Sequence, residues 1–272
     1  MVAVAEAGAR GVSCRNSRGC GHVHLDLRGM RALRFYQPGD LTVGCDAGMT
    51  AAELNRVLAR EGQFVPLDVA DAERTTLGAI LAQHLSGPPR PRFGTVRDFT
   101  IGMEMIAMTE AGPRLVHSGG RVVKNVAGYD WMKLAIGARG GFGIITGVNF
   151  KVFPLPKGEL VATFSGVSGD ELGRRILHSP LRPLAIEVEA GGEGRVQVRC
   201  AGSERVLDRC RAELQAMAAG GASVSFDAGI KFAVQHDQAR TGGAMDAATR
   251  ELQQKLKTEL DPLNRFHGGD CE

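Results

Sequence analysis

The segment from Gly119 to Phe153 constrains this chain more than any other. It reads GGRVVKNVAGYDWMKLAIGARGGFGIITGVNFKVF, with glycine clusters on either side of a short helical stretch and an alternating apolar strand after them. Glycine lets the backbone approach a bulky ligand where side chains would block it. Polar groups of Lys124, Asn125, Tyr129 and Asp130 fall within the same turn-rich stretch. This combination indicates a nucleotide cofactor site.

Length and charge exclude several other classes of protein. The 272 residues suffice for one large domain or two modest ones, with a proper core. The net charge of +3, from 33 basic and 30 acidic residues, is too balanced to indicate nucleic acid binding. No apolar run reaches the roughly 18 residues that a bilayer span requires. The first residues also lack the pattern of a signal peptide, so we expect a cytoplasmic protein.

The cysteines and histidines form no recognisable metal site. The six cysteines lie far apart, at positions 14, 20, 45, 200, 210 and 271, and none form a CxxC pair. His22 and His24 share one strand face, but no nearby carboxylate or thiolate pair completes a ligand set. We interpret the cysteines as core or surface thiols and the two histidines as surface residues, and we expect no metal.

Local patterns predict a first domain over residues 22–156, after a poorly ordered start over residues 1–21. Strands are expected at 23–27, 33–36, 41–47, 101–108 and 114–117. Thr50 and Glu53 have the spacing of a capping box, and Gly62 is a natural helix stop. Thr76 is expected to cap a second helix. Residues 86–94 carry three prolines and predict a rigid loop.

The pattern changes after residue 156 and predicts a second domain over residues 157–272. Strand and helix signals alternate there in the order βαββαβ, which is the ferredoxin-like arrangement. The two central strands are joined by the glycine-rich turn at 191–194. A final helix is expected at about residues 245–260.

Two short stretches have both a structural and a functional interpretation. Thr76, Leu77 and Gly78 leave the start of a helix accessible, and its free N–H groups would favour a pyrophosphate. The alternative is a capped helix that packs closely on a sheet. The arginines at 90, 92 and 97 either form a solvated basic loop or neutralise a phosphate or a carboxylate substrate.

Residues 123–130 (VKNVAGYD) and 143–146 (GIIT) resemble the FAD-binding subunits of bacterial glycolate oxidase. These subunits belong to the flavoprotein family that includes vanillyl-alcohol oxidase and p-cresol methylhydroxylase (PCMH). Residues 86–99, SGPPRPRFGTVRDF, are most similar to the smaller, E-type subunit. The ending at residues 261–266 resembles the family's carboxyl-terminal signature more weakly.

The resemblance implies an α+β fold in two parts. The first is a PCMH-type FAD-binding fold over residues 22–156, and the second is a ferredoxin-like α+β substrate or cap domain over residues 157–272. Family members carry a further strand and a glycine-rich loop some tens of residues before the position of His22. We therefore expect part of the first subdomain, and with it part of the cofactor cradle, to be missing here.

The resemblance also implies which residues bind FAD, although it identifies no catalytic residue. Three groups are assigned to the cofactor, together with two polar positions: Thr76, Leu77, Gly78, Ser86 and Gly87 at the pyrophosphate and ribose; Gly94, Arg97 and Asp98 near the flavin; Gly143, Ile144 and Ile145 at the adenine or ribose; and Lys124 and Tyr129 as the polar positions.

The function implied is that of a glycolate oxidase subunit, which is part of a 2-hydroxy acid dehydrogenase. Hydride would pass from the hydroxyl-bearing carbon of glycolate to the flavin, giving glyoxylate. The implied partners are a larger FAD-binding subunit and an iron–sulfur subunit, through which the cytoplasmic chain could lie peripheral to the inner membrane. The alternatives are a non-catalytic assembly subunit that no longer holds FAD, and an independent oxidase of the same fold.

Overall fold

The computed structural model describes residues 13–16, 23–122, 131–188, 195–218 and 223–228. They divide into two compact units. The first unit contains the described residues up to Leu85 together with Thr95–Phe153, and the second contains Ser86–Gly94 and the described residues from Pro154 onward. None of the helices within these described ranges is long and apolar enough to cross a membrane.

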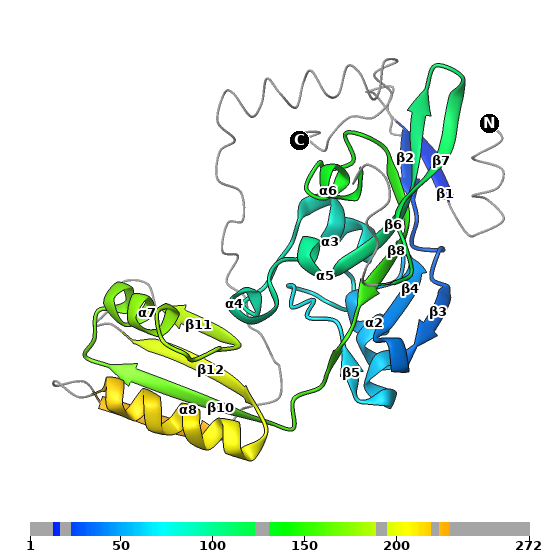
Figure 1. Cartoon of the computed structure of the whole chain (residues 1–272). Coiled ribbons are helices and arrows are strands. Elements are labelled where there is room, and N and C mark those ends of the chain that lie inside the picture. Colours follow the sequence, from blue (N-terminus) through cyan, green and yellow to red (C-terminus); the bar gives the residue numbers. More distant parts are fainter. Residues whose placement is uncertain (1–12, 17–22, 123–130, 189–194, 219–222, 229–272) are drawn as a thin grey trace. The chain divides into compact units, whose positions relative to one another are not determined.

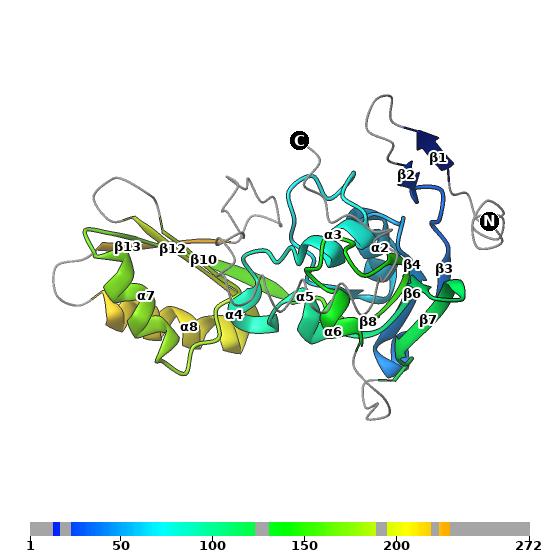
Figure 2. The same ribbon diagram turned by 90° about the horizontal axis from the view of Figure 1, so that it is seen from above.

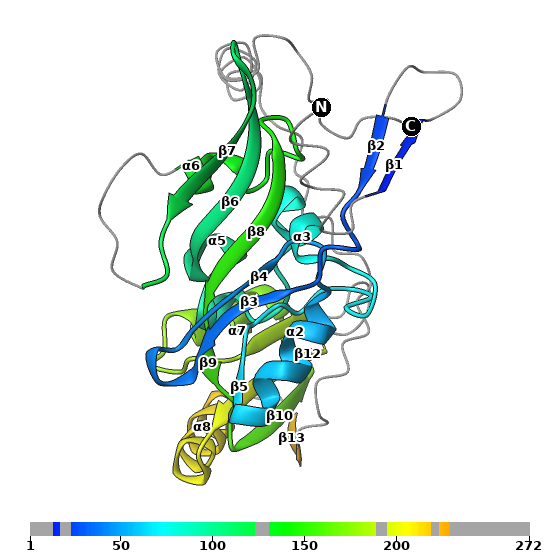
Figure 3. The same cartoon turned by 90° about the vertical axis from the view of Figure 1, so that its right-hand side faces the viewer.

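The first unit is built on a five-stranded antiparallel sheet, which Figure 3 shows face-on. Its strands, in spatial order, are β3 (Leu33–Gln37), β4 (Thr42–Asp46), β8 (Ile144–Lys151), β6 (Thr100–Thr109) and β7 (Gly112–Gly119). Short strand pairs flank it: β1 (Ser13–Asn16) with β2 (Val23–Asp26), and β5 (Gln63–Phe64) with β9 (Phe153–Pro154). The alternation of side chains along each strand separates a core face from an outer face.

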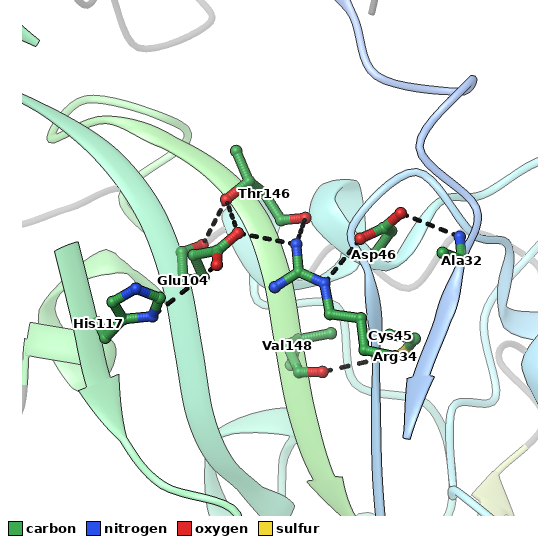
Figure 4. Close-up of polar contacts among 8 residues, drawn as sticks. All are labelled: Ala32, Arg34, Cys45, Asp46, Glu104, His117, Thr146 and Val148. Carbon is green, nitrogen blue, oxygen red and sulfur yellow. Dashed lines mark hydrogen bonds and ion pairs between the residues drawn. The ribbon is translucent and has the colours of Figure 1, made fainter. Parts of the chain in front are cut away.

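Helices pack against the core face of this sheet (Figure 1). They are α2 (Ala51–Leu58), α3 (Leu77–Gln83), α5 (Val96–Phe99) and α6 (Trp131–Ala135). The single 3-10 turns η1 (Pro38–Asp40) and η2 (Ala59–Glu61) contain no buried residue. Val43 and Cys45 of β4 are fully buried beneath them with Phe150 of β8. The side chains of Asp46 and Glu104 lie instead on the outer face (Figure 4).

The capping box predicted from Thr50 and Glu53 is confirmed. The Thr50 hydroxyl accepts a hydrogen bond from the Glu53 amide at 3.2 Å, and the Glu53 carboxylate accepts one from the Thr50 amide at 3.0 Å. Thr50→Ala is expected to lower the free energy of unfolding by about 1 kcal/mol, because it removes the cap of α2. Ser168→Ala is the matched control, since Ser168 begins a helix without a side-chain cap and its loss is expected to change little. Urea denaturation of both variants measures this, and equal effects would contradict it.

The second unit has the predicted ferredoxin-like order of elements. Along the chain these are β10 (Gly158–Ser165), α7 (Gly169–Leu177), β11 (Ala185–Val188), β12 (Val196–Gly202), α8 (Glu204–Met217) and β13 (Ser223–Ala228). The strands pair antiparallel in the order β11-β12-β10-β13. Figure 2 shows α7 and α8 on the same side of this sheet, where Leu172, Ile176 and Leu214 are buried. The expected α+β class is thus confirmed.

The structure differs from the local predictions in two places. Ser13–Asn16 pairs with Val23–Asp26, although residues 1–21 were expected to be poorly ordered. Backbone pairing supplies order there that the side-chain pattern did not indicate. The predicted rigid loop contains the helical turn α4 (Arg90–Phe93), which has a proline near its start, where the missing N–H costs nothing. The helix expected at residues 245–260 lies outside the described residues.

Candidate functional site

The amino-terminal N–H groups of α3 are all used within the protein. The amide of Leu77 donates to the carbonyl of Met49 at 2.9 Å, and that of Gly78 to Ala47 at 2.7 Å. The next amide donates to the Thr76 hydroxyl at 3.3 Å, so the predicted threonine cap is confirmed. The expectation that these N–H groups are free is therefore wrong, while the assignment of Thr76, Leu77 and Gly78 to the cofactor stays a prediction. The close-packed alternative describes α3 correctly.

Two glycines assigned to the cofactor lie close to other backbone atoms inside the first unit. A Cβ atom on Gly78 would lie 3.2 Å from the Ala47 carbonyl oxygen, which reflects the close approach of α3 to the sheet. A Cβ atom on Gly143 would lie 2.4 Å from the carbonyl oxygen of Ile106, and Gly143 also has a φ of +153°. Ile144 and Ile145 continue into β8 and pair with β6. Packing alone accounts for these positions.

The residues 86–94 cluster with the second unit, not with the unit that contains α3. The Arg92 guanidinium donates through Nη1 to the carbonyl of Ala201 at 2.5 Å, which anchors α4 to the end of β12. Ser86, Gly87 and Gly94 belong to this segment. The contacts of Arg92 thus group this segment with the ferredoxin-like sheet, whereas the sequence placed it in the first domain.

Arg97 and Asp98 lie instead in the first unit, on α5, which there contacts the glycine-rich segment 119–153. The Arg97 guanidinium donates through Nη2 to the carbonyl of Ile136 at 3.1 Å. Its Nε atom is buried and has no hydrogen-bond partner. The neighbouring Gly137 amide donates to the carbonyl of Leu81 at 2.9 Å, so this corner also contacts the carboxyl end of α3. We call the group Leu81, His84, Arg97, Asp98 and Ile136–Gly137 the α5 corner.

Asp98 shapes the α5 corner through its own backbone contacts. Its Oδ2 atom accepts hydrogen bonds from the Thr95 amide at 2.7 Å and from the Thr95 hydroxyl at 2.9 Å. The backbone hydrogen bond lowers the pKa of the Asp98 carboxyl most, and the charges of His84 and Arg97 add to that effect. Asp98 is therefore an ionised cap of α5 that balances the charge of Arg97.

Two side chains hold the ends of the glycine-rich motif, and sequence reasoning did not identify either of them. The Asn149 amide donates to the carbonyl of Gly120 at 2.9 Å. The Ser118 hydroxyl accepts a hydrogen bond from the amide of Met132 at 3.2 Å. Lys124 and Tyr129, the predicted polar positions, lie outside the described residues. His84 was also missed; its left-handed backbone, with a φ of +54°, ends α3 in the corner.

A second polar cluster crosses the outer face of the sheet (Figure 4). Arg34 is held between two carboxylates, with 2.7 Å from its Nε to Asp46 Oδ1 and 2.7 Å from its Nη2 to Glu104 Oε1. Thr146 donates its hydroxyl to Glu104 at 2.8 Å, and His117 lies 3.8 Å from the same carboxylate. The cluster joins strands β3, β4, β6, β7 and β8. Because Arg34 is already neutralised by Asp46 and Glu104, we interpret the cluster as a structural clamp.

The clamp predicts a pH-dependent contribution to stability. Burial alone would raise the pKa of Glu104, but hydrogen bonds from Arg34 and Thr146 outweigh it and lower that pKa below its ordinary 4.5. The Glu104 carboxylate therefore stabilises the fold above pH 4.5, and this contribution is lost as the pH falls below that value. Glu104→Gln is expected to cost about 2 kcal/mol at pH 7. In urea titrations at several pH values, the difference from the natural protein should shrink below pH 4.5; a constant difference would contradict the assignment.

The fold of this chain is similar to that of a solved structure, and part of its sequence matches a family of FAD-binding domains. The fold resembles alkyldihydroxyacetonephosphate synthase, with a TM-score of 0.57 and 18% identity over 71% of this chain and 41% of that one. This likeness defines the fold class alone. Residues 3–111 match the FAD binding domain family. FAD is accordingly the cofactor of this domain.

The curated relatives are flavoprotein subunits and dehydrogenases. The chain is 34% identical over 188 residues to the glycolate oxidase subunit GlcE of Escherichia coli (strain K12), covering 69% of this chain and 53% of that protein. It is 29% identical to the glycolate oxidase subunit GlcD of Bacillus subtilis (strain 168), over 54% of this chain and 31% of that protein. It is 30% identical to a mitochondrial D-lactate dehydrogenase of Arabidopsis thaliana, over 52% of this chain and 24% of that protein. The chain thus spans about half or less of these relatives.

The α5 corner has donor chemistry that fits FAD, whereas the start of α3 does not. Arg97 supplies a fixed positive charge and a buried Nε donor without a partner. Such a donor suits an anionic oxygen of a phosphate group. The first turn of α3 has no donor to spare. Among the predicted cofactor residues that the structure describes, Arg97 has a buried donor atom without a partner.

Proposed function

We propose that this chain is the FAD-binding component of a 2-hydroxy acid oxidoreductase, and specifically of a glycolate oxidase. The similarity to a glycolate oxidase subunit, which extends over 69% of the chain, supports the assignment. The single structural observation that carries it is the buried, unpartnered Nε of Arg97 in the α5 corner. Bound FAD would supply the acceptor for a hydride from the hydroxyl-bearing carbon of glycolate, which would become glyoxylate.

The chain's own residues have binding and positioning roles in this proposal. Arg97 holds an anionic oxygen of the cofactor through Nε, while its contact with Ile136 fixes the guanidinium plane. Asp98 caps α5 by accepting a hydrogen bond from the Thr95 amide, and so fixes the position of Arg97 on that helix. Asn149 and Ser118 hold the two ends of the segment that carries Lys124 and Tyr129. We assign no general base to this chain.

We also propose that the chain works in a complex. Its relatives include two different glycolate oxidase subunits, GlcE and GlcD. A larger FAD-binding subunit would then carry out the substrate chemistry, and an iron–sulfur subunit would remove the electrons. Such partners would also determine whether the assembly is cytoplasmic or peripheral to a membrane.

The test is flavin binding by the full chain. The purified protein is titrated with FAD while the flavin fluorescence is followed, and bound flavin is then released by acid and identified. Saturable binding of FAD supports the proposal. Glycolate oxidation should then require the larger subunit, and should be absent with the chain alone. Absence of FAD binding, both alone and with that subunit, would overturn it.

One observation favours a second function, an assembly subunit without FAD. The N–H groups at the start of α3 are engaged with Met49 and Ala47, so this helix offers no anion site. A colourless chain that still assembles with the larger subunit, and still restores its glycolate oxidation, would support this second function. The same titration and the same assembly assay therefore separate the two proposals.

A further inference from the structure

The chain leaves the first unit between α3 and α5 and then returns to it. Residues 86–94 cluster with the second unit, whereas Leu85 before them and Thr95 after them belong to the first. The helices α3 and α5 already contact each other, so this excursion is not needed to bring them together. Prolines at positions 88, 89 and 91 restrict its backbone. We call residues 86–94 the arm.

Arg92 anchors the arm within the second unit. Its guanidinium donates through Nη1 to the carbonyl of Ala201, near the end of β12. The helical turn α4, which carries Arg92, also contacts β11 (Figure 1). A charged donor makes a stronger hydrogen bond to a carbonyl than a neutral one does. The contact with Ala201 has no role in the proposed function as stated above.

Backbone hydrogen bonds continue from the anchored turn into α5. The amide of Gly94 donates to the carbonyl of Arg90 at 3.0 Å, and that of Thr95 donates to Oδ2 of Asp98 at 2.7 Å. Gly94 turns the chain between the two helices with a φ of +79°, a conformation that glycine adopts readily. Because α5 begins directly after Thr95, a constraint on Arg92 is passed along this short, hydrogen-bonded path to α5.

We propose that Arg92 is a positioning residue for the cofactor and acts through Arg97. By holding the arm to β12, it keeps α5 in the place where the buried Nε of Arg97 can meet an anionic oxygen. The inference rests on the proposed function for the identity of that ligand, FAD. Without the anchor, the arm would be held through its two ends and the contact of α4 with β11, and α5 would open locally more often.

Hydrogen exchange of the full chain without FAD tests the anchoring. In Arg92→Ala, the amides of residues 95–99 are expected to exchange about fivefold faster than in the natural protein, because a hydrogen bond from a charged donor is lost. Arg92→Lys still provides a charged donor and is expected to keep most of the protection. Arg90→Ala is the matched control, since Arg90 is an exposed arginine of the same turn, and it is expected to change little.

Two exchange results would overturn the inference. One is unchanged exchange of residues 95–99 in Arg92→Ala. The other is an equal acceleration in α2, which is distant from the arm in the sequence, because it would indicate a general loss of stability. Both results are obtained without flavin.

Titration with FAD then tests the role of the anchor in binding. Arg92→Ala is expected to weaken FAD binding about fivefold, and Arg92→Lys to recover most of the affinity. In an Arg97→Met background, Arg92→Ala is expected to have no further effect, because both residues act through one contact. A full additional loss in that background, or natural affinity in Arg92→Ala alone, would overturn the inference. If the natural chain binds no FAD, the proposed function fails, while the exchange experiment still decides whether Arg92 anchors α5.

Discussion

Replacing Arg34 with methionine is expected to destabilise the first unit by about 3 kcal/mol. The substitution leaves the carboxylates of Asp46 and Glu104 facing each other without a cation, and their side chains are only 8% and 12% exposed. Removing one partner of a buried ion pair costs about 3–5 kcal/mol, because the other charge stays buried without a partner. The Arg34 side chain is 24% exposed, which places the expected loss at the lower end of this range. Urea denaturation at pH 7 measures the change.

Arg56→Met is the matched control for Arg34. Arg56 also forms an ion pair, at 3.0 Å from Glu73, but both side chains are more than half exposed. Solvent screens such pairs, and the loss is expected to stay below about 0.5 kcal/mol. If the two variants lose similar stability, then the clamp on the outer face does not hold the sheet together. A double variant, Arg34→Met with Glu104→Gln, is expected to recover part of the loss because one of the two unpaired charges is removed.

Replacing Arg97 with methionine is expected to weaken FAD binding by about 10- to 100-fold, the range for a lost charge-assisted hydrogen bond. Methionine keeps much of the volume but provides neither the charge nor the Nε donor. Arg97→Lys is expected to recover part of the affinity, since it restores the charge without the planar guanidinium. Fluorescence titration with FAD gives the Kd for each variant.

Arg90→Met is the control for Arg97, because Arg90 is an exposed arginine of the same SGPPRPRFGTVRDF motif. It is expected to leave the affinity for FAD within about twofold. Thermal unfolding of all three variants shows whether the lost hydrogen bond to Ile136 has destabilised the fold instead. Arg97→Met that folds normally and binds FAD as well as the natural chain would contradict the role assigned to the α5 corner.

Local sequence patterns predicted most of the elements near the site. The caps at Thr50 and Thr76 form as expected, since they depend only on residues three positions away. The βαββαβ order of the second unit is also confirmed, because turn glycines and alternating apolar residues mark each element. Family resemblance predicted the cofactor, which the match of residues 3–111 to the FAD binding domain family confirms.

The predicted contacts of the site were less successful, because they depend on residues that are distant in the sequence. Nothing within α3 itself indicates that Met49 and Ala47 supply carbonyls to its first amides. Likewise, the Arg92 contact with Ala201 joins residues 86–94 to the ferredoxin-like unit. The partners of Arg97 and Arg34 also come from other elements.

Short-range preferences therefore indicated most of the helices and strands of the described residues, and the motifs indicated the flavoprotein family that the chain resembles. Packing established which polar groups remain available to a ligand. A backbone amide at a helix start is free or satisfied according to what the fold places beside it, and burial removes water as the alternative partner. For this reason the glycine-rich segment indicated a nucleotide cofactor, whereas Arg97 could be proposed as its contact only once α5 and Ile136 were seen together.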